Sequence, residues 1–369
     1  MIGRYCDLNN IKEISNLITG LDFRKPEYRR EVFLRFYEYH TKHKGHAGAV
    51  YYSFPYIFNK MELSTEEKLW FCFINGCSQN VISTYIIFKN FPDIKNLNTD
   101  LLNDWFTRNY KKIGWDTDRR YFKNSFIKDL IHYRNLLKGN TQEQFFSNIC
   151  NTDDPRLNFD KLWSVVLNDY SHFGRLSTFS YIEYLKISGL NVDCSNLFLE
   201  DLKGSKSHRN GLCKVLGRDD LEWTKINTPD YTKEIIDWLK VEAELLLNEA
   251  KKRFGDENVN YFTLETTLCC YKGWHRVNRR YPNVYNDMFS DRIKYAQSKW
   301  DNIDLSIFWD SRKHHLPKRL RIEDNPDDYG LCKIKQNHYR LTGQVIMMDG
   351  DYKCFKNNLG KQKQTTLGL

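Results

Sequence analysis

The twenty residues of Cys269–Met288, CCYKGWHRVNRRYPNVYNDM, combine basic and aromatic side chains. Residues four apart share a helix face, so a helix that reached Tyr281 would carry two adjacent basic rows. One row is His275 with Arg279, and the other is Arg276 with Arg280. With Trp274 and Tyr281 beside them, these rows suit a phosphodiester that carries an unstacked base. The alternative is a helix that packs its rings inward and leaves its arginines in solvent.

A second polar segment lies between two glycines, Gly204 and Gly211. The bracketed residues are Ser205, Lys206, Ser207, His208, Arg209 and Asn210. Glycine allows a backbone to approach a ligand closely, and hydroxyl groups mixed with basic side chains form a phosphate-binding composition. We therefore predict a mobile loop that contacts phosphate, with His208 and Arg209 as candidate catalytic residues. A basic loop exposed to solvent is the alternative.

Paired arginines follow an expected helix end in the segment GWDTDRRYFK. Arg119 and Arg120 could each donate a pair of hydrogen bonds to phosphate oxygens, because the planar guanidinium group matches their geometry. Asp118, which lies directly before them, could hold an arginine or act as a base. A surface cap with ion pairs inside the helix is the alternative interpretation of this segment.

A turn followed by a helix is predicted for YSHFGRLSTFSYIEYLKISG. Gly174 permits the turn, which places His172, Arg175 and Ser177 near the N-terminus of the helix. Unpaired backbone N–H groups at such a terminus favour anions. We therefore predict that Arg175 and Ser177 contact substrate and that His172 is a catalytic candidate. A local helix cap without function is the alternative.

Metal-binding patterns are weak in this sequence. His40, His43 and His46 are spaced three apart, but the first and third do not share a helix face. We therefore interpret them as an exposed basic helix end, with phosphate binding and metal binding as the alternatives. The ten cysteines include no Cys-x-x-Cys pair, which argues against a structural zinc site. Buried, reduced thiols and no metal ligand among the site residues are the expectation.

The elements that must position these residues are mostly helices. Apolar residues recur at helical spacing through most of the chain. Ser64 and Glu67 form a capping box, and Gly255 is expected to end a long helix capped by Thr228. In the segment 339–350, apolar and polar residues alternate as they do in a small β hairpin. We predict a mainly α, multi-helix protein with helical lobes at 1–150 and 151–354, which could also form one continuous domain, and a flexible tail at 355–369.

Composition restricts the class of protein and its partners. The 369 residues are 41% hydrophobic and 15% aromatic, with a net charge of +9, so we expect a folded, basic protein that binds nucleic acid, an anionic membrane or phosphorylated ligands. No apolar run approaches the roughly 20 residues that span a bilayer, and the first residues do not resemble a secretory signal. A soluble, cytoplasmic protein is therefore expected.

Six segments in order resemble one family. They are LWFCFINGCSQN, DTDRRY, HFGRLSTFSYIEYL, NLFLEDLKGSKSHRNGLCKVLGRDDLEW, LETTLCCYKGWHRVNRRYPNVYNDM and KQNHYRLTG. Their series, from about residue 28 to 348, resembles the phage α-glutamyl/putrescinyl thymine pyrophosphorylases, also called amino acid:DNA transferases. The resemblance implies a two-lobed helical fold like that of DNA glycosylases. The Leu-x-Gly-Val-Gly hairpin of many such glycosylases is not visible here, which puts that fold in question.

The resemblance also implies an activity. Such enzymes act on phage DNA whose hydroxymethyluracil carries a pyrophosphate, and they replace that group with an amino acid or polyamine. The location would be the host cytoplasm during infection, and a hydroxymethyluracil DNA kinase would supply the substrate. Mg²⁺ could assist the departing pyrophosphate.

The residue patterns agree with this chemistry. A flipped base needs stacking rings and a basic cleft, a departing pyrophosphate needs cations, and the amine needs a base. We hypothesise that His208 and Arg209 meet Arg276 and Arg279 around the pyrophosphate. A non-catalytic nucleic-acid-binding protein and a DNA glycosylase remain the alternatives.

Overall fold

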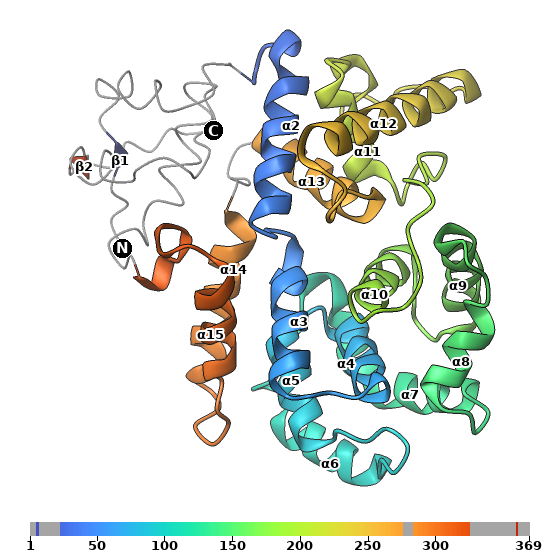
Figure 1. The fold of residues 1–369 in the computed structure, drawn as a ribbon, viewed down its shortest axis with the longest axis vertical. Helices are drawn as coiled ribbons and strands as arrows, with labels where there is room; N and C mark the ends of the chain where they lie inside the picture. Colours follow the sequence, from blue (N-terminus) through green and yellow to red (C-terminus); the bar gives the residue numbers. More distant parts are fainter. Residues whose placement is uncertain (1–4, 7–22, 276–282, 325–358, 361–369) are drawn as a thin grey trace. The chain divides into compact units, whose positions relative to one another are not determined.

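The computed structural model describes residues 5–6, 23–275, 283–324 and 359–360. These residues are mainly helical, as predicted, and Figure 1 shows the helices along the chain. The two-residue strands β1 (Tyr5–Cys6) and β2 (Leu359–Gly360) pair in antiparallel fashion. The hairpin predicted at 339–350 lies outside the described residues. None of the helices in the described ranges is both long and apolar enough to cross a bilayer.

The described residues group into two compact units whose segments alternate along the sequence. The first unit takes its residues from Met1–His46, Leu197–Asp287 and Leu316–Leu369, and the second takes Ala47–Asn196 and Met288–His315. The lobes predicted at 1–150 and 151–354 stay a prediction.

The first unit is built around four helices. They are α2 (Pro26–Lys42), α11 (Lys206–Val215), α12 (Lys233–Phe254) and α13 (Tyr261–Trp274), with short 3₁₀ turns η4 (Asp219–Leu221), η5 (Lys318–Leu320) and η6 (Ile322–Asp324). Helix α2 packs on the other three. The buried Tyr37 hydroxyl on α2 lies 2.7 Å from the Thr263 hydroxyl on α13, so a polar pair joins the two helices inside an aromatic core.

The second unit surrounds a buried helix, α4 (Thr65–Ser78), which contacts α5, α7, α8 and α10. The other helices are α3 (Val50–Lys60), α5 (Val81–Asn90), α6 (Thr99–Asn109), α7 (Arg120–Leu136), α8 (Gln142–Ile149), α9 (Pro155–Asp169), α10 (Arg175–Ile187) and α15 (Ser306–His315), with 3₁₀ turns η2 (Ala47–Ala49) and η3 (Thr117–Arg119). The helix α14 (Val284–Gln297) contributes residues to both units. The predicted capping box of Ser64 and Glu67 begins α4, as expected.

Two expectations about local structure are wrong. Residues 206–210 belong to the helix α11 instead of a loop, because Leu212, Cys213 and Val215 give this segment a buried apolar face. The long helix α12 begins at Lys233 with Thr232 as its cap, four residues later than the predicted cap. Gly255 does end it, as predicted.

The histidines predicted at an exposed helix end are buried instead. His40 and His46 are at most 1% exposed. The His40 ring stacks on Phe36 with ring centroids 5.1 Å apart, and its Nδ1 lies 3.0 Å from the hydroxyl of Thr267. Aromatic neighbours and hydrogen bonds to the chain therefore place this histidine in the core of the first unit.

The buried His40 makes the folded state sensitive to acid. Burial lowers its pKa from the usual 6.5 to about 4, so the folded state binds fewer protons than the unfolded state between these values. The stabilisation is present above about pH 6.5 and is lost as the pH falls toward 4, by about 3 kcal/mol. Urea unfolding at pH 7, 6 and 5 should show a shallower loss for His40→Gln than for the unmodified protein. The exposed His132 offers the control His132→Gln, which should keep the full loss; equal slopes for both variants would contradict this assignment.

Candidate active site

Three of the segments quoted for the family resemblance meet in the second unit, at the C-terminal end of α4. The buried Arg119 guanidinium joins them, because it donates to the Gly76 carbonyl at 3.3 Å and to the Leu176 carbonyl at 3.2 Å. The Trp115 indole also donates to the Cys77 carbonyl at 2.6 Å. Arg119 was predicted to bind phosphate, and its contacts in the structure are those of a clamp between α4 and α10.

The turn before α10 presents a histidine–carboxylate pair. The His172 Nδ1 atom lies 2.6 Å from Asp129 Oδ1 on α7. Asp129 is buried, with 1% of its side chain exposed, whereas 49% of the His172 side chain is exposed. The second carboxylate oxygen of Asp129 accepts a hydrogen bond from the Ser125 hydroxyl at 2.7 Å. A buried carboxylate thus holds one edge of an imidazole whose other edge faces solvent.

This geometry assigns the proton on the imidazole. Nδ1 faces a carboxylate oxygen and must donate, so Nε2 of the neutral ring carries the lone pair. Within the described ranges, no hydrogen-bond partner of Nε2 is found. A histidine oriented in this way can accept a proton from a substrate, and the carboxylate stabilises the imidazolium that forms. His172 is therefore well placed for general-base catalysis.

Local sequence explains how the pair is positioned. His172 adopts a left-handed backbone with φ of 61°, and Gly174 two residues later is the N-cap of α10. Asp129 was not among the residues predicted from the sequence, although its position in the sequence could have indicated it. It falls on the apolar stripe of α7, with Phe122, Phe126 and Tyr133, where a buried carboxylate needs a partner.

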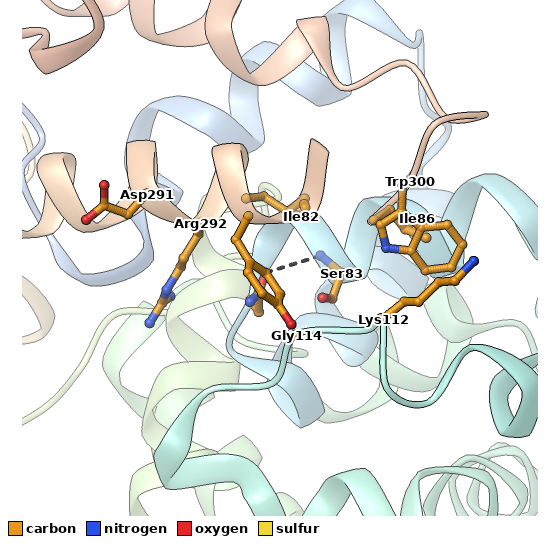
Figure 2. A pocket seen from close by; sticks show the side chains of 11 residues that line it. Ile82, Ser83, Ile86, Lys112, Gly114, Asp291, Arg292 and Trp300 are labelled. Atoms are coloured by element: carbon orange, nitrogen blue, oxygen red, sulfur yellow. Dashed lines mark hydrogen bonds between the residues drawn. The ribbon is translucent and has the colours of Figure 1, made fainter. Parts of the chain in front are cut away.

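A pocket of about 180 Å³ opens in the same unit, and Figure 2 shows its lining. The charged residues at its wall are Lys112, Asp291 and Arg292. Arg292 pairs at 2.5 Å with Asp116, the residue three before Arg119. The Lys112 amino group lies 5.4 Å from the ring centre of Trp300. Charges of both signs around a small cavity suit a zwitterion such as an amino acid.

The other predicted site residues of this unit differ in their exposure. Asp118 and Arg120 are exposed and could reach a ligand. Ser177 is buried, and its hydroxyl donates to the Gly174 carbonyl at 2.9 Å within the first turn of α10. Arg175 is partly exposed at the first position of α10. A larger pocket of about 560 Å³, between α4 and α8, contains none of the predicted site residues.

In the first unit, α11 and α13, which carry the described parts of the two segments richest in predicted site residues, pack against each other. The buried His208 Nδ1 lies 2.9 Å from Glu265 Oε1, and its Nε2 lies 2.8 Å from the Leu197 carbonyl oxygen. Next to it, the Lys272 amino group donates to the Ser207 hydroxyl. Glu265 and Lys272 were not predicted, although they share a face of α13 at helical spacing.

Arg209 and its neighbours are engaged with the backbone. The Arg209 guanidinium donates to the carbonyls of Leu199 and Leu202 at 3.1 and 2.5 Å, among others, and it lies over the Tyr231 ring at 4.4 Å. The Ser205 hydroxyl donates to the Phe198 carbonyl at 2.5 Å. These contacts favour a structural role for both residues. Lys206 is partly exposed, with its amino group over the Trp223 ring.

The end of α13 packs its rings inward. Trp274 is 4% exposed and lies 4.4 Å from the Phe36 ring. His275 caps the helix, and burial lowers its pKa to about 3. The predicted residues Arg276, Arg279, Arg280 and Tyr281 lie outside the described residues. The predicted meeting of arginines around a pyrophosphate therefore stays a prediction.

Comparison with known proteins identifies the class as a transferase. A family model described as amino acid:DNA transferase matches residues 52–281. Because the match covers more than half of the chain, this protein belongs to the amino acid:DNA transferase family and catalyses the transfer of an amino acid to DNA. A Serinyltransferase of Salmonella phage ViI is 29% identical over 344 residues, which cover 88% of this chain and 83% of the relative. No solved structure matches the chain.

Proposed function

We propose that this transferase displaces pyrophosphate from 5-(pyrophosphoryloxymethyl)uracil in phage DNA with an amino acid or polyamine. The bond between the 5-methylene carbon and the pyrophosphate oxygen breaks, and a carbon–nitrogen bond forms. The amine loses one proton, and pyrophosphate leaves with the electron pair of the broken bond. The family match supports transfer to DNA, and the resemblance of the six ordered segments to the thymine pyrophosphorylases supports the finer substrate.

The pair of His172 and Asp129 is the observation that carries this proposal. The amino group of a free amino acid or polyamine is more basic than a peptide N-terminus, whose pKa is about 7.7–8.0, so most of the co-substrate is protonated at neutral pH and cannot attack. Nε2 of His172 would accept that proton, and Asp129 would stabilise the resulting imidazolium. The pocket lined by Asp291 and Lys112 in the same unit has charges of both signs, which suit the ammonium and carboxylate of an amino acid.

The leaving group requires positive charge. As pyrophosphate departs, cations and N–H donors aimed at the developing charge lower the barrier. The exposed Arg120 begins α7, the helix that carries Asp129, and the partly exposed Arg175 begins α10, three residues after His172. Mg²⁺ could add to these charges. The substrate would be supplied by a kinase that phosphorylates hydroxymethyluracil in DNA, since the transferase itself forms no phosphate bond.

One experiment separates this proposal from its alternatives. DNA that contains the pyrophosphorylated base is incubated with the protein and a mixture of amino acids and polyamines. Pyrophosphate release and the mass of the digested nucleosides are then measured. We expect equal amounts of pyrophosphate and of an aminated thymine nucleoside. Abasic sites would identify a glycosylase, and bound but unchanged DNA would identify a binding protein.

DNA binding should depend steeply on salt, because the chain carries a net charge of +9. Each phosphate that the protein neutralises on duplex DNA should lower log affinity by about 0.9 per log unit of salt. Fluorescence anisotropy at 50 to 200 mM NaCl measures the slope. Unmodified DNA of the same length is the control, and it should give a similar slope because phosphate contacts do not read the base. A flat profile would contradict the assigned DNA substrate.

A further inference from the structure

Three side chains of different chemistry converge between α11 and α13. They are His208 on α11, and Glu265 and Cys269 one turn apart on α13. His208 Nδ1, a Glu265 carboxylate oxygen and Cys269 Sγ all lie within 4.8 Å of one another. Cys269 Sγ is 3.4 Å from Glu265 Oε1, the oxygen that also lies 2.9 Å from His208 Nδ1. One carboxylate oxygen therefore faces both of the other groups.

The histidine cannot satisfy both of its neighbours as a neutral ring. Both ring nitrogens of His208 face oxygen acceptors, the Leu197 carbonyl and Glu265. A neutral imidazole has one N–H, so its second nitrogen would point a lone pair at an oxygen. The ring is completely buried, where such a conflict is costly. Either a second proton or a metal ion must lie between the imidazole and the carboxylate.

We propose that His208, Glu265 and Cys269 bind a divalent transition-metal ion of the zinc type. The set of one imidazole, one carboxylate and one thiolate matches zinc, whereas Mg²⁺ and Ca²⁺ prefer oxygen ligands alone. Three protein ligands leave a fourth tetrahedral position open for water or a ligand oxygen. The Glu265 carboxylate and the Cys269 thiolate balance the charge of the ion, so the neighbouring Lys272 ammonium group does not face a net positive site. Binding releases to solvent both the thiol proton of Cys269 and the proton that otherwise lies between His208 Nδ1 and Glu265.

The fold positions the three ligands for this purpose. Zinc bonds of about 2.0 Å to nitrogen and oxygen and about 2.3 Å to sulfur place tetrahedral ligand atoms roughly 3.3–3.6 Å apart. The 3.4 Å between Cys269 Sγ and Glu265 Oε1 matches this spacing, and the 2.9 Å between His208 Nδ1 and Glu265 Oε1 must open slightly. His208 and Cys269 lie within 4.8 Å of each other. The Leu197 carbonyl orients the imidazole, as backbone carbonyls do for zinc-bound histidines. Gly211 lets α11 approach α13 closely, because a Cβ there would lie 2.3 Å from the Leu268 carbonyl oxygen.

Metal content of the full-length protein tests the site. The protein is stripped with chelator under reducing conditions, titrated with Zn²⁺, and assayed by calorimetry and elemental mass spectrometry. We expect one zinc ion per chain, with affinity reduced by roughly 10² or more in Cys269→Ser and Glu265→Gln. Cys213→Ser is the matched control, because it removes a buried thiol of α11 that lies outside the cluster. No stoichiometric zinc, or equal affinity in all variants, would overturn the proposal.

A second measurement uses the unmodified protein, so that it does not depend on the folding of a variant. Co²⁺ should give the absorption band of a cobalt–thiolate bond, and Zn²⁺ should slow alkylation of Cys269. Cys150 in the second unit is also partly exposed, and its alkylation rate should not change. If Zn²⁺ does not change the alkylation rate of Cys269, the proposal is wrong, and His208 and Glu265 form an ion pair without a metal. The proposed metal site does not depend on the proposed reaction, so a negative result for one of them leaves the other standing.

Discussion

Replacing His172 with asparagine should lower the single-turnover rate of amine transfer by roughly 10²–10⁴-fold, the usual contribution of a positioned general base. Asparagine tolerates the left-handed backbone that His172 adopts, and the histidine side chain is half exposed. Stability should fall by about 1–3 kcal/mol, because the change removes the ring N–H that pairs with the buried Asp129 carboxylate. DNA affinity should stay nearly constant, because the proposed phosphate ligands are arginines and not His172.

The pH profile gives this prediction a signature that a structural role lacks. Without the base, transfer should become faster as the pH rises through the pKa of the free amine, because hydroxide and solvent then remove the proton. Added imidazole should partly restore the rate. The control His132→Asn changes an exposed histidine of α7 outside the pair and should leave the rate unchanged. A rate within twofold of the unmodified protein for His172→Asn would exclude His172 as the base.

Asp129→Asn should act in the same direction. An amide in place of the carboxylate presents an N–H to His172 Nδ1 and favours the tautomer whose proton is on Nε2, which cannot accept another. Loss of the buried charge also removes the stabilisation of the imidazolium. Single-turnover pyrophosphate release and amine incorporation, measured on the same sample, should fall together. If only folding stability changes, Asp129 has a structural role.

Gly211→Ala should have the largest effect on stability, a loss of about 3 kcal/mol in the free energy of unfolding, which is the upper end for an overpacked site. The added methyl group would lie 2.3 Å from the Leu268 carbonyl oxygen. A backbone atom in the middle of α13 cannot move aside as the end of a flexible side chain can. The two helices must therefore separate, which disturbs both the His208–Glu265 pair and the Ser207–Lys272 contact.

Urea unfolding monitored by circular dichroism measures this change. The matched control is Gly174→Ala, because a Cβ at that position meets no atom within 4 Å and φ there is −85°. Gly174 is an N-cap, so its substitution should cost no more than about 1 kcal/mol. Equal losses for the two variants would show that the close approach of α11 and α13 is not a constraint on stability.

Local patterns in the sequence were sufficient for much of the secondary structure. Apolar residues at helical spacing indicated the mainly α fold, and the chemistry of Ser64 and Glu67 located the start of α4. Gly255 located the end of α12. These features depend on neighbours within one or two turns, so they can be recognised without tertiary contacts. The ordered series of segments likewise indicated the amino acid:DNA transferase family, which the match to the family model confirms.

Only the tertiary structure decided which polar residues are paired. Asp129 and His172 are 43 residues apart, and Glu265 and His208 are 57 apart, so neither pair has a local pattern. Burial determined the contacts of the other charged residues. Arg209 is of a residue type that commonly binds phosphate, but its guanidinium group donates to backbone carbonyls. A charged side chain in the sequence can face substrate, a partner side chain or the backbone, and long-range packing determines which of these it contacts.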